Sequence, residues 1–197
     1  EAMAMVKEHF IKTVGVPKFT IGVGCSGGAE QLHPIGDAYP GLLDGIIVGC
    51  NFPDVITSKV TNVTDADLFE HYMKSTKTKW TIEQYAAATG YPNDTSATLN
   101  AVQAIRVKAQ GGSCRDNVPK ETRYDRSSNP KGVRCDIFDH NINYFGADPA
   151  TGAARRTLDN VGVQYGLAAL NDGRISKAQF IDLNRLIGGY DNDGDYV

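Results

Sequence analysis

The stretch GCSGG at residues 24–28 matches the pattern G-x-S-x-G, and the segments around it decide the fold. The preceding residues 18–23 (KFTIGV) are rich in side chains that favour a β-strand. Residues 29–38 favour a helix that Pro34 should bend, and residues 42–49 (LLDGIIVG) contain a second strand of the buried type. This order of strand, sharp turn, helix and strand predicts a right-handed βαβ unit of a parallel sheet.

Ser26 is the expected nucleophile of this turn. A serine at the tip of a strand-to-helix turn is held in strained backbone geometry, which presents its hydroxyl to a substrate. Side chains two residues before and two residues after it would collide, so Gly24 and Gly28 occupy those places. The helix that follows directs its N-terminus at the site, and the backbone amide of Gly27 is placed to stabilise the oxyanion of a tetrahedral intermediate.

Two other interpretations of the glycine-rich turn are open. Gly22, Gly24 and Gly27 loosely fit the G-x-G-x-x-G pattern of a phosphate-binding loop. A dinucleotide site would need an acidic residue after the next strand, where residues 49–51 are Gly-Cys-Asn, so this interpretation is disfavoured. The remaining interpretation is a structural turn that only packs tightly.

Four stretches of the chain resemble known hydrolases. Residues 21–29 (IGVGCSGGA) and 39–47 (YPGLLDGII) resemble the nucleophile region of the tannase and fungal feruloyl-esterase group, which carries Gly-Cys-Ser-x-Gly-Gly and then Tyr-Pro-x-x-Phe-Asp-Gly-Ile. Residues 159–167 (DNVGVQYGL) and 180–189 (FIDLNRLIGG) resemble, more closely, a little-characterised family of secreted bacterial α/β-hydrolases. These resemblances imply a serine esterase that forms an acyl-enzyme on Ser26 and cleaves a small-molecule carboxylic ester.

The predicted fold class is α/β, with an α/β-hydrolase-type parallel sheet fragment and a mostly helical lid or insertion. Residues 1–58 are expected to be part of the hydrolase core with the nucleophile elbow, and residues 59–197 to form the helical part. Two capping boxes, which begin at Thr81 and Ser176, mark helix starts. The expected helices span residues 1–14, 65–75, 81–88, 94–110, 159–170 and 176–187.

The four cysteines have no CxxC spacing, so we expect disulfides rather than zinc. In the tannase group, the cysteine before the serine bonds to a cysteine beside the catalytic histidine, but no such Cys-His pair follows here. Cys25 and Cys50 instead follow successive strands at one sheet edge, within reach of a bridge. Cys114 and Cys135 would then close the polar loop of residues 111–143. Two disulfides indicate a secreted or periplasmic protein, whereas four buried thiols would indicate the cytosol.

A base and an orienting carboxylate must follow the serine in the order Ser, Asp or Glu, His. His9 precedes Ser26, His33 lies seven residues along the next helix, and His71 lies on an amphipathic helix. His140 follows in a polar loop with acids nearby, which makes it the internal candidate for the base. The favoured interpretation is that the chain is a fragment, and that another chain of the same precursor supplies the Asp and the His.

Composition excludes several other functions. The net charge is -3 and the pI is near 5.8, which favours no nucleic-acid partner. No apolar run approaches the roughly 20 residues that cross a bilayer, so no membrane partner is expected. Residues 171–180 imitate half of an EF-hand without its ligands, and residues 191–195 (DNDGD) are expected to be a solvated terminus rather than a calcium site. We therefore expect no metal and no cofactor.

The helical part carries aromatic residues that bear on the substrate. Tyr72, Trp80 and Tyr85 would line a pocket for the acyl or alcohol group, or would be ordinary core residues. The alternative to an esterase is a non-catalytic binding or structural module that kept the hydrolase-like turn. The environment of the Ser26 hydroxyl discriminates between the two functions.

Overall fold

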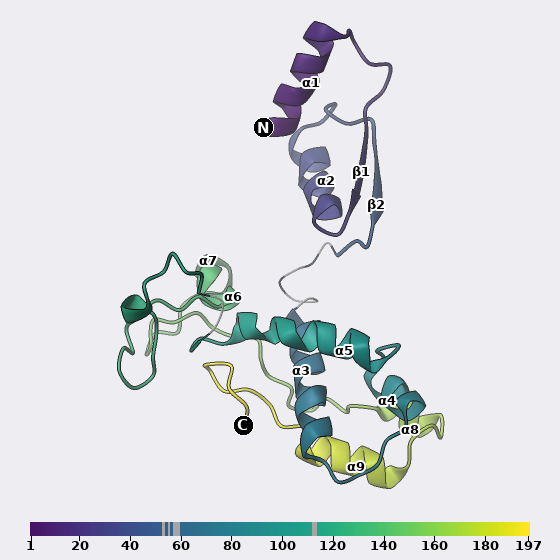
Figure 1. Cartoon of the computed structure of the whole chain (residues 1–197), viewed down its shortest axis with the longest axis vertical. Coiled ribbons are helices and arrows are strands. Elements are labelled where there is room, and N and C mark those ends of the chain that lie inside the picture. The colour runs from purple at the N-terminus through teal and green to yellow at the C-terminus, as the bar shows by residue number, and fades with distance from the viewer. Residues whose placement is uncertain (53, 55, 57–59, 112–113) are drawn as a thin grey trace. The chain divides into compact units, whose positions relative to one another are not determined.

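The chain forms two compact units, residues 1–59 and residues 60–197, which we call unit 1 and unit 2 (Figure 1). The predicted boundary between residues 58 and 59 lies outside the described residues. The mixed α/β class is confirmed, because helices accompany a small parallel sheet. The computed structural model describes residues 1–52, 54, 56, 60–111 and 114–197.

Unit 1 is built around the predicted βαβ motif. Its two strands pair in parallel, and their carboxyl ends meet where Cys25 lies opposite Gly49. The connecting helix runs through Pro34 and packs on both strands. The parallel arrangement predicted from the sequence is therefore confirmed. The elements of unit 1 are α1 (Ala2–Thr13), β1 (Ile21–Cys25), α2 (Gly27–Ala38) and β2 (Gly45–Gly49).

Most large apolar side chains of unit 1 are accessible to solvent. Among its described residues, Ala29 is the one apolar residue classed as buried. Helix α1 buries none of its side chains, every second residue of β1 is exposed, and β2 exposes Ile46, Ile47 and Gly49. Unit 1 thus has secondary structure without a core of its own. The most exposed large apolar residues are Met5, Val6, Val14, Val16, Phe19, Val23 and Ile47.

Unit 2 is mostly helical and has a true hydrophobic core. Helix α3 packs against α5 and against the 3₁₀ helix η2, while α4 packs against α8. One core cluster centres on α3 and α9, and contains Leu68, Tyr72 and Leu183. The elements are α3 (Val60–Ser75), α4 (Ile82–Thr89), α5 (Asp94–Ala101), η2 (Val102–Val107), η3 (Lys120–Thr122), α6 (Ile137–His140), α7 (Ile142–Phe145), α8 (Leu167–Asn171) and α9 (Lys177–Leu186).

Both predicted capping boxes are present. Thr81 caps α4 and Ser176 caps α9, in each case with a glutamine at the third helical position that bonds back to the cap. The two boxes are also joined, because the Gln179 side-chain amide donates to Gln84 Oε1 at 2.9 Å. Since each box satisfies free amides of a first helical turn, this link fixes the starts of two helices against each other.

Two predicted helices are longer than those observed. The α-helical part of residues 94–110 ends at Ala101 and continues as a 3₁₀ helix. Residues 159–166 are not helical, and only α8 remains of the predicted helix 159–170. The Asp159 carboxylate accepts the Val161 amide instead of leaving it to a helix, and Gly166 lies at φ 78°. A local turn therefore replaces the first two turns of that helix.

The polar loop of residues 111–143 is cross-linked as predicted by a disulfide between Cys114 and Cys135. It also contains η3 and α6, so it is a structured segment in its described part.

Among the described residues, no helix is both long and apolar enough to cross a membrane.

The acidic stretch of residues 191–195 is only partly solvated, because Asp193 and Gly194 are buried whereas Asn192 and Asp195 are exposed. Asp193 is buried and pairs with Arg126 and Arg134. Its carboxylate also accepts the Tyr124 hydroxyl at 2.8 Å. The expectation of a solvated terminus was wrong for Asp193, because these guanidinium groups lie far away in the sequence. In the part of the chain that the structure describes, no group of three or more His, Cys, Asp or Glu side chains is arranged to hold a metal ion.

Candidate functional site

Ser26 occupies the turn between β1 and α2 in a conformation that side-chain-bearing residues rarely adopt. Its backbone angles are φ 54° and ψ -123°. Its N–H donates to the Gly49 carbonyl and its own carbonyl accepts the Glu30 amide, both at 3.1 Å. Its side chain is exposed and does not cap α2. The strained turn predicted at this serine is thus present, and strain of this kind costs on the order of 1–3 kcal/mol that the surrounding bonds must offset.

Gly24 allows strand and helix to approach closely behind the serine. A Cβ atom added there would lie 2.5 Å from the Gly28 carbonyl carbon and 2.9 Å from the Ala29 nitrogen. A Cβ atom added at Gly28 would meet nothing within 4 Å. The steric requirement predicted for Gly24 is confirmed, and the one predicted for Gly28 is wrong. The reason is directional, since Gly28 contributes the backbone against which Gly24 packs while its own Cβ position faces open space.

The backbone amide of Gly27 is available at the start of α2. Gly27 is the first residue of that helix, so no carbonyl four residues earlier in the helix can accept its N–H. No other described residue accepts it either. Together with the positive end of the helix dipole, this donor favours negative charge beside the Ser26 side chain.

Two cysteines flank the serine without bonding to each other. Cys25 and Cys50 are exposed free thiols, so the predicted Cys25–Cys50 disulfide is not formed in this structure. They are nevertheless neighbours, and a hydrogen bond with Cys50 raises the pKa of the Cys25 thiol. A bridge demands a specific dihedral geometry about its sulfur atoms, which these two side chains do not adopt. The backbone of Cys50 is itself left-handed, with φ 46°.

No histidine of unit 1 is bonded to the serine hydroxyl in the described structure. His33 Nε2 lies 3.1 Å from Asn51 Oδ1, so its ring is engaged elsewhere. Seven residues along an α-helix amount to about 10 Å at 1.5 Å each, which agrees with the expectation that His33 is too far from Ser26. His9 is exposed on α1. Among the described residues of unit 1, an exposed serine hydroxyl and the Gly27 amide thus lie at the turn, and no histidine is hydrogen-bonded to that hydroxyl.

His140 is exposed at the end of α6 in unit 2. The acids beside it in the sequence serve another partner, because Arg156 pairs with Asp136 and with Asp139 at 2.8 Å each. Burial, with Asp136 nearby, raises the pKa of Asp139. Since Ser26 and His140 belong to different units, their pairing stays a prediction.

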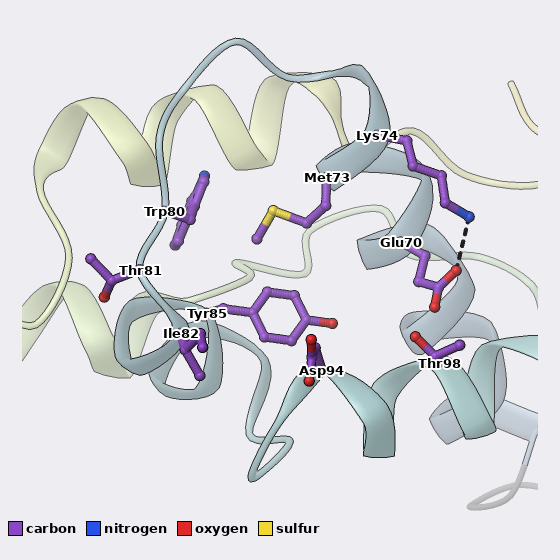
Figure 2. Close-up of a pocket in the computed structure, with 9 residues that line it drawn as sticks. All are labelled: Glu70, Met73, Lys74, Trp80, Thr81, Ile82, Tyr85, Asp94 and Thr98. Atoms are coloured by element: carbon purple, nitrogen blue, oxygen red, sulfur yellow. Dashed lines mark hydrogen bonds and ion pairs between the residues drawn. The ribbon is translucent and has the colours of Figure 1, made fainter.

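Unit 2 contains a pocket of about 530 Å³ between α3, α4 and α5 (Figure 2). Trp80 and Tyr85 line it, as predicted. Tyr72 does not, because it is completely buried in the core, where its hydroxyl donates to Asp182 and accepts the Trp80 indole N–H. The polar residues of this pocket were not predicted from the sequence. The lining residues are Glu70, Met73, Lys74, Trp80, Thr81, Ile82, Tyr85, Asp94 and Thr98.

Comparison with known proteins identifies the family. No curated protein and no solved structure matches the chain. The family match covers every residue, 1–197, and its description agrees with the tannase resemblance seen around Ser26. The chain therefore belongs to a tannase-like family of unknown function (DUF6351).

Proposed function

We propose that this chain carries the nucleophile of a serine hydrolase that cleaves small carboxylic esters, with Ser26 as the attacking residue. The observation that carries the proposal is the exposed Ser26 side chain at φ 54°, between a parallel strand and a helix N-terminus. Membership of a tannase-like family agrees with an esterase-type reaction. An α/β-hydrolase core around this elbow is part of the same proposal.

In the proposed reaction, Ser26 Oγ attacks the ester carbonyl carbon while a general base takes its proton. The carbonyl oxygen becomes an oxyanion beside the Gly27 amide, which donates to it. Collapse of this intermediate expels the alcohol, which receives the proton from the base, and leaves an acyl group on Ser26. Water then attacks the acyl-enzyme in the same manner, releasing the acid and restoring the hydroxyl.

The base and its carboxylate are proposed to come from outside unit 1. His33 is bonded to Asn51, and Asp136 and Asp139 are bonded to Arg156. We propose that another chain of the same precursor supplies the Asp and the His, with His140 as the internal alternative. A serine without a base is a poor nucleophile at neutral pH, so the activity of the 197 residues alone is expected to be low.

A fluorophosphonate probe tests the nucleophile, because it labels only activated serines. The precursor that contains this chain should be labelled on the peptide that carries Ser26, as read by mass spectrometry. Ser26→Ala should abolish the label, whereas Ser128→Ala, an exposed serine in the polar loop, should keep it. A label that survives Ser26→Ala, or none on a precursor that hydrolyses esters, would overturn the assignment. His140→Ala discriminates the internal base from an external one.

A non-catalytic module is the second candidate function. It is favoured by one observation, that no imidazole of unit 1 is hydrogen-bonded to the Ser26 hydroxyl among the described residues. If this candidate is correct, the precursor should neither react with the probe nor hydrolyse esters such as 4-nitrophenyl acetate, although unit 2 still folds.

We also propose that the protein is secreted or periplasmic. The Cys114–Cys135 disulfide supports this location, because such bonds persist mainly in oxidising compartments.

A further inference from the structure

The pocket of unit 2 has one apolar side and one polar side (Figure 2). Met73, Trp80 and Ile82 form the apolar side, and Trp80 offers an aromatic surface to the cavity. A volume of about 530 Å³ is in the range of small-molecule sites. All of these residues belong to unit 2, so the pocket is complete within one folded unit.

Tyr85 connects the two sides. The residue is only 9% exposed, and its ring packs edge-to-face against Phe69. Figure 2 shows this hydroxyl directed to the side of the pocket where Asp94 and Thr98 lie. Burial, with the charges of Glu70 and Asp94, raises the pKa of Tyr85 to about 12, so the hydroxyl stays protonated at neutral pH. The hydroxyl can therefore donate or accept a hydrogen bond on the polar side of the pocket.

The polar side carries more negative than positive charge. Lys74 Nζ lies 2.9 Å from Glu70 Oε2, so the lysine is already neutralised by that carboxylate. Burial alone would raise the pKa of Glu70, but hydrogen bonds from Thr98 and Lys74 outweigh it and hold the pKa below its usual value. Asp94 has no salt bridge among the described residues, and its bonds are to Thr95 alone. The Asp94 carboxylate, which is exposed in the first turn of α5 and forms no salt bridge among the described residues, therefore lines an aromatic cavity.

We infer that this pocket binds a small organic cation with an apolar body, such as a protonated arylalkylamine. The apolar body lies against Met73, Trp80 and Ile82, where the burial of apolar surface contributes. The ammonium group donates to the Asp94 carboxylate and to the Tyr85 hydroxyl. An anionic ligand would place its charge beside Asp94 and Glu70 and is disfavoured. The inference is independent of Ser26 catalysis.

The single tryptophan of the chain, Trp80, makes this binding directly measurable. Benzylamine, which is protonated at pH 7, should change the Trp80 fluorescence in a saturable manner. Benzyl alcohol has nearly the same shape without the charge and should bind about tenfold more weakly, since charge-assisted hydrogen bonds are about twice as strong as neutral ones. Benzoate should bind more weakly still. Calorimetry on the same samples detects binding that leaves fluorescence unchanged.

Two substitutions separate the site from nonspecific attraction. Asp94→Asn should weaken benzylamine binding about tenfold and leave benzyl alcohol unaffected. Asp172→Asn removes an exposed carboxylate of unit 2 that does not line the pocket, and should change neither. Equal binding of the cation, the alcohol and the anion would overturn the inference, as would equal effects of the two substitutions or no heat of binding for benzylamine. Ser26→Ala should leave binding intact, so a failure here is distinct from a failure of the proposed hydrolase.

Discussion

Gly24 and Gly28 flank the proposed nucleophile symmetrically in the sequence, but the structure gives them different roles. Gly24→Ala places a Cβ atom 2.5 Å from backbone that cannot move independently of α2. We expect a loss of about 1–3 kcal/mol in unfolding free energy, typical of overpacking, together with the loss of probe labelling at Ser26. The measurement is urea denaturation followed by circular dichroism, in parallel with labelling.

Gly28→Ala is the matched control for that substitution. Its Cβ atom meets no neighbour, and it lies in a helix, where alanine is favoured over glycine by roughly 0.5–1 kcal/mol. Equal losses from the two substitutions would contradict the one-sided packing seen at the turn.

At the scale of elements, local patterns predicted the structure well and distant pairings did not. The capping boxes at Thr81 and Ser176 depend on residues within one turn, and the βαβ motif lies within one continuous stretch, residues 21–49, so the sequence indicates both directly. The helix predicted over residues 159–170 failed for an equally local reason, because Asp159 bonds to the backbone and begins a turn. The strained turn at Ser26 was predictable because the residues that form it are adjacent in the sequence, whereas the origin of a catalytic base stays a proposal.

Asp193 illustrates a pairing that the local sequence could not predict, and it confers a pH dependence. It ties the C-terminal segment to Arg126 and Arg134, which lie more than fifty residues earlier. Burial alone would raise the pKa of Asp193, but the Tyr124 hydroxyl and the two guanidinium groups outweigh it and hold that pKa below its usual value. The folded state therefore binds this proton less tightly than the unfolded state does.

The resulting stabilisation is complete above pH about 4, the ordinary pKa of an aspartate, and is lost as the pH falls through the lower pKa of the folded state. At pH 7, Asp193→Asn should lower the unfolding free energy by about 2 kcal/mol, a typical value for hydrogen bonds to a charged group. The difference between wild type and variant should shrink as the pH falls from 4 to 2. Thermal unfolding across this range measures it, and a constant difference would show that the charge of Asp193 is irrelevant.

At the scale of the whole molecule, the two units differ in how they are stabilised. The core clusters of unit 2 consist entirely of its own residues, from Val60 to Tyr196, and its loop is closed by Cys114–Cys135. A disulfide that closes a loop of this length contributes about 3 kcal/mol by constraining the unfolded chain. Unit 1 has neither a disulfide nor, among its described residues, a buried apolar side chain larger than that of Ala29.

Separate polypeptides should therefore behave differently. Residues 60–197 alone should unfold cooperatively and keep the Trp80 emission maximum of the whole chain, because Trp80 packs within unit 2. Residues 1–59 alone should show no cooperative transition, since chains of this size rarely fold without a well-buried core. Circular dichroism melts of both pieces test this, and cooperative unfolding of residues 1–59 would contradict it. If this expectation is met, the parallel strands beside Ser26 need apolar side chains from outside unit 1 to bury their exposed surface. We propose the same external origin for the catalytic base.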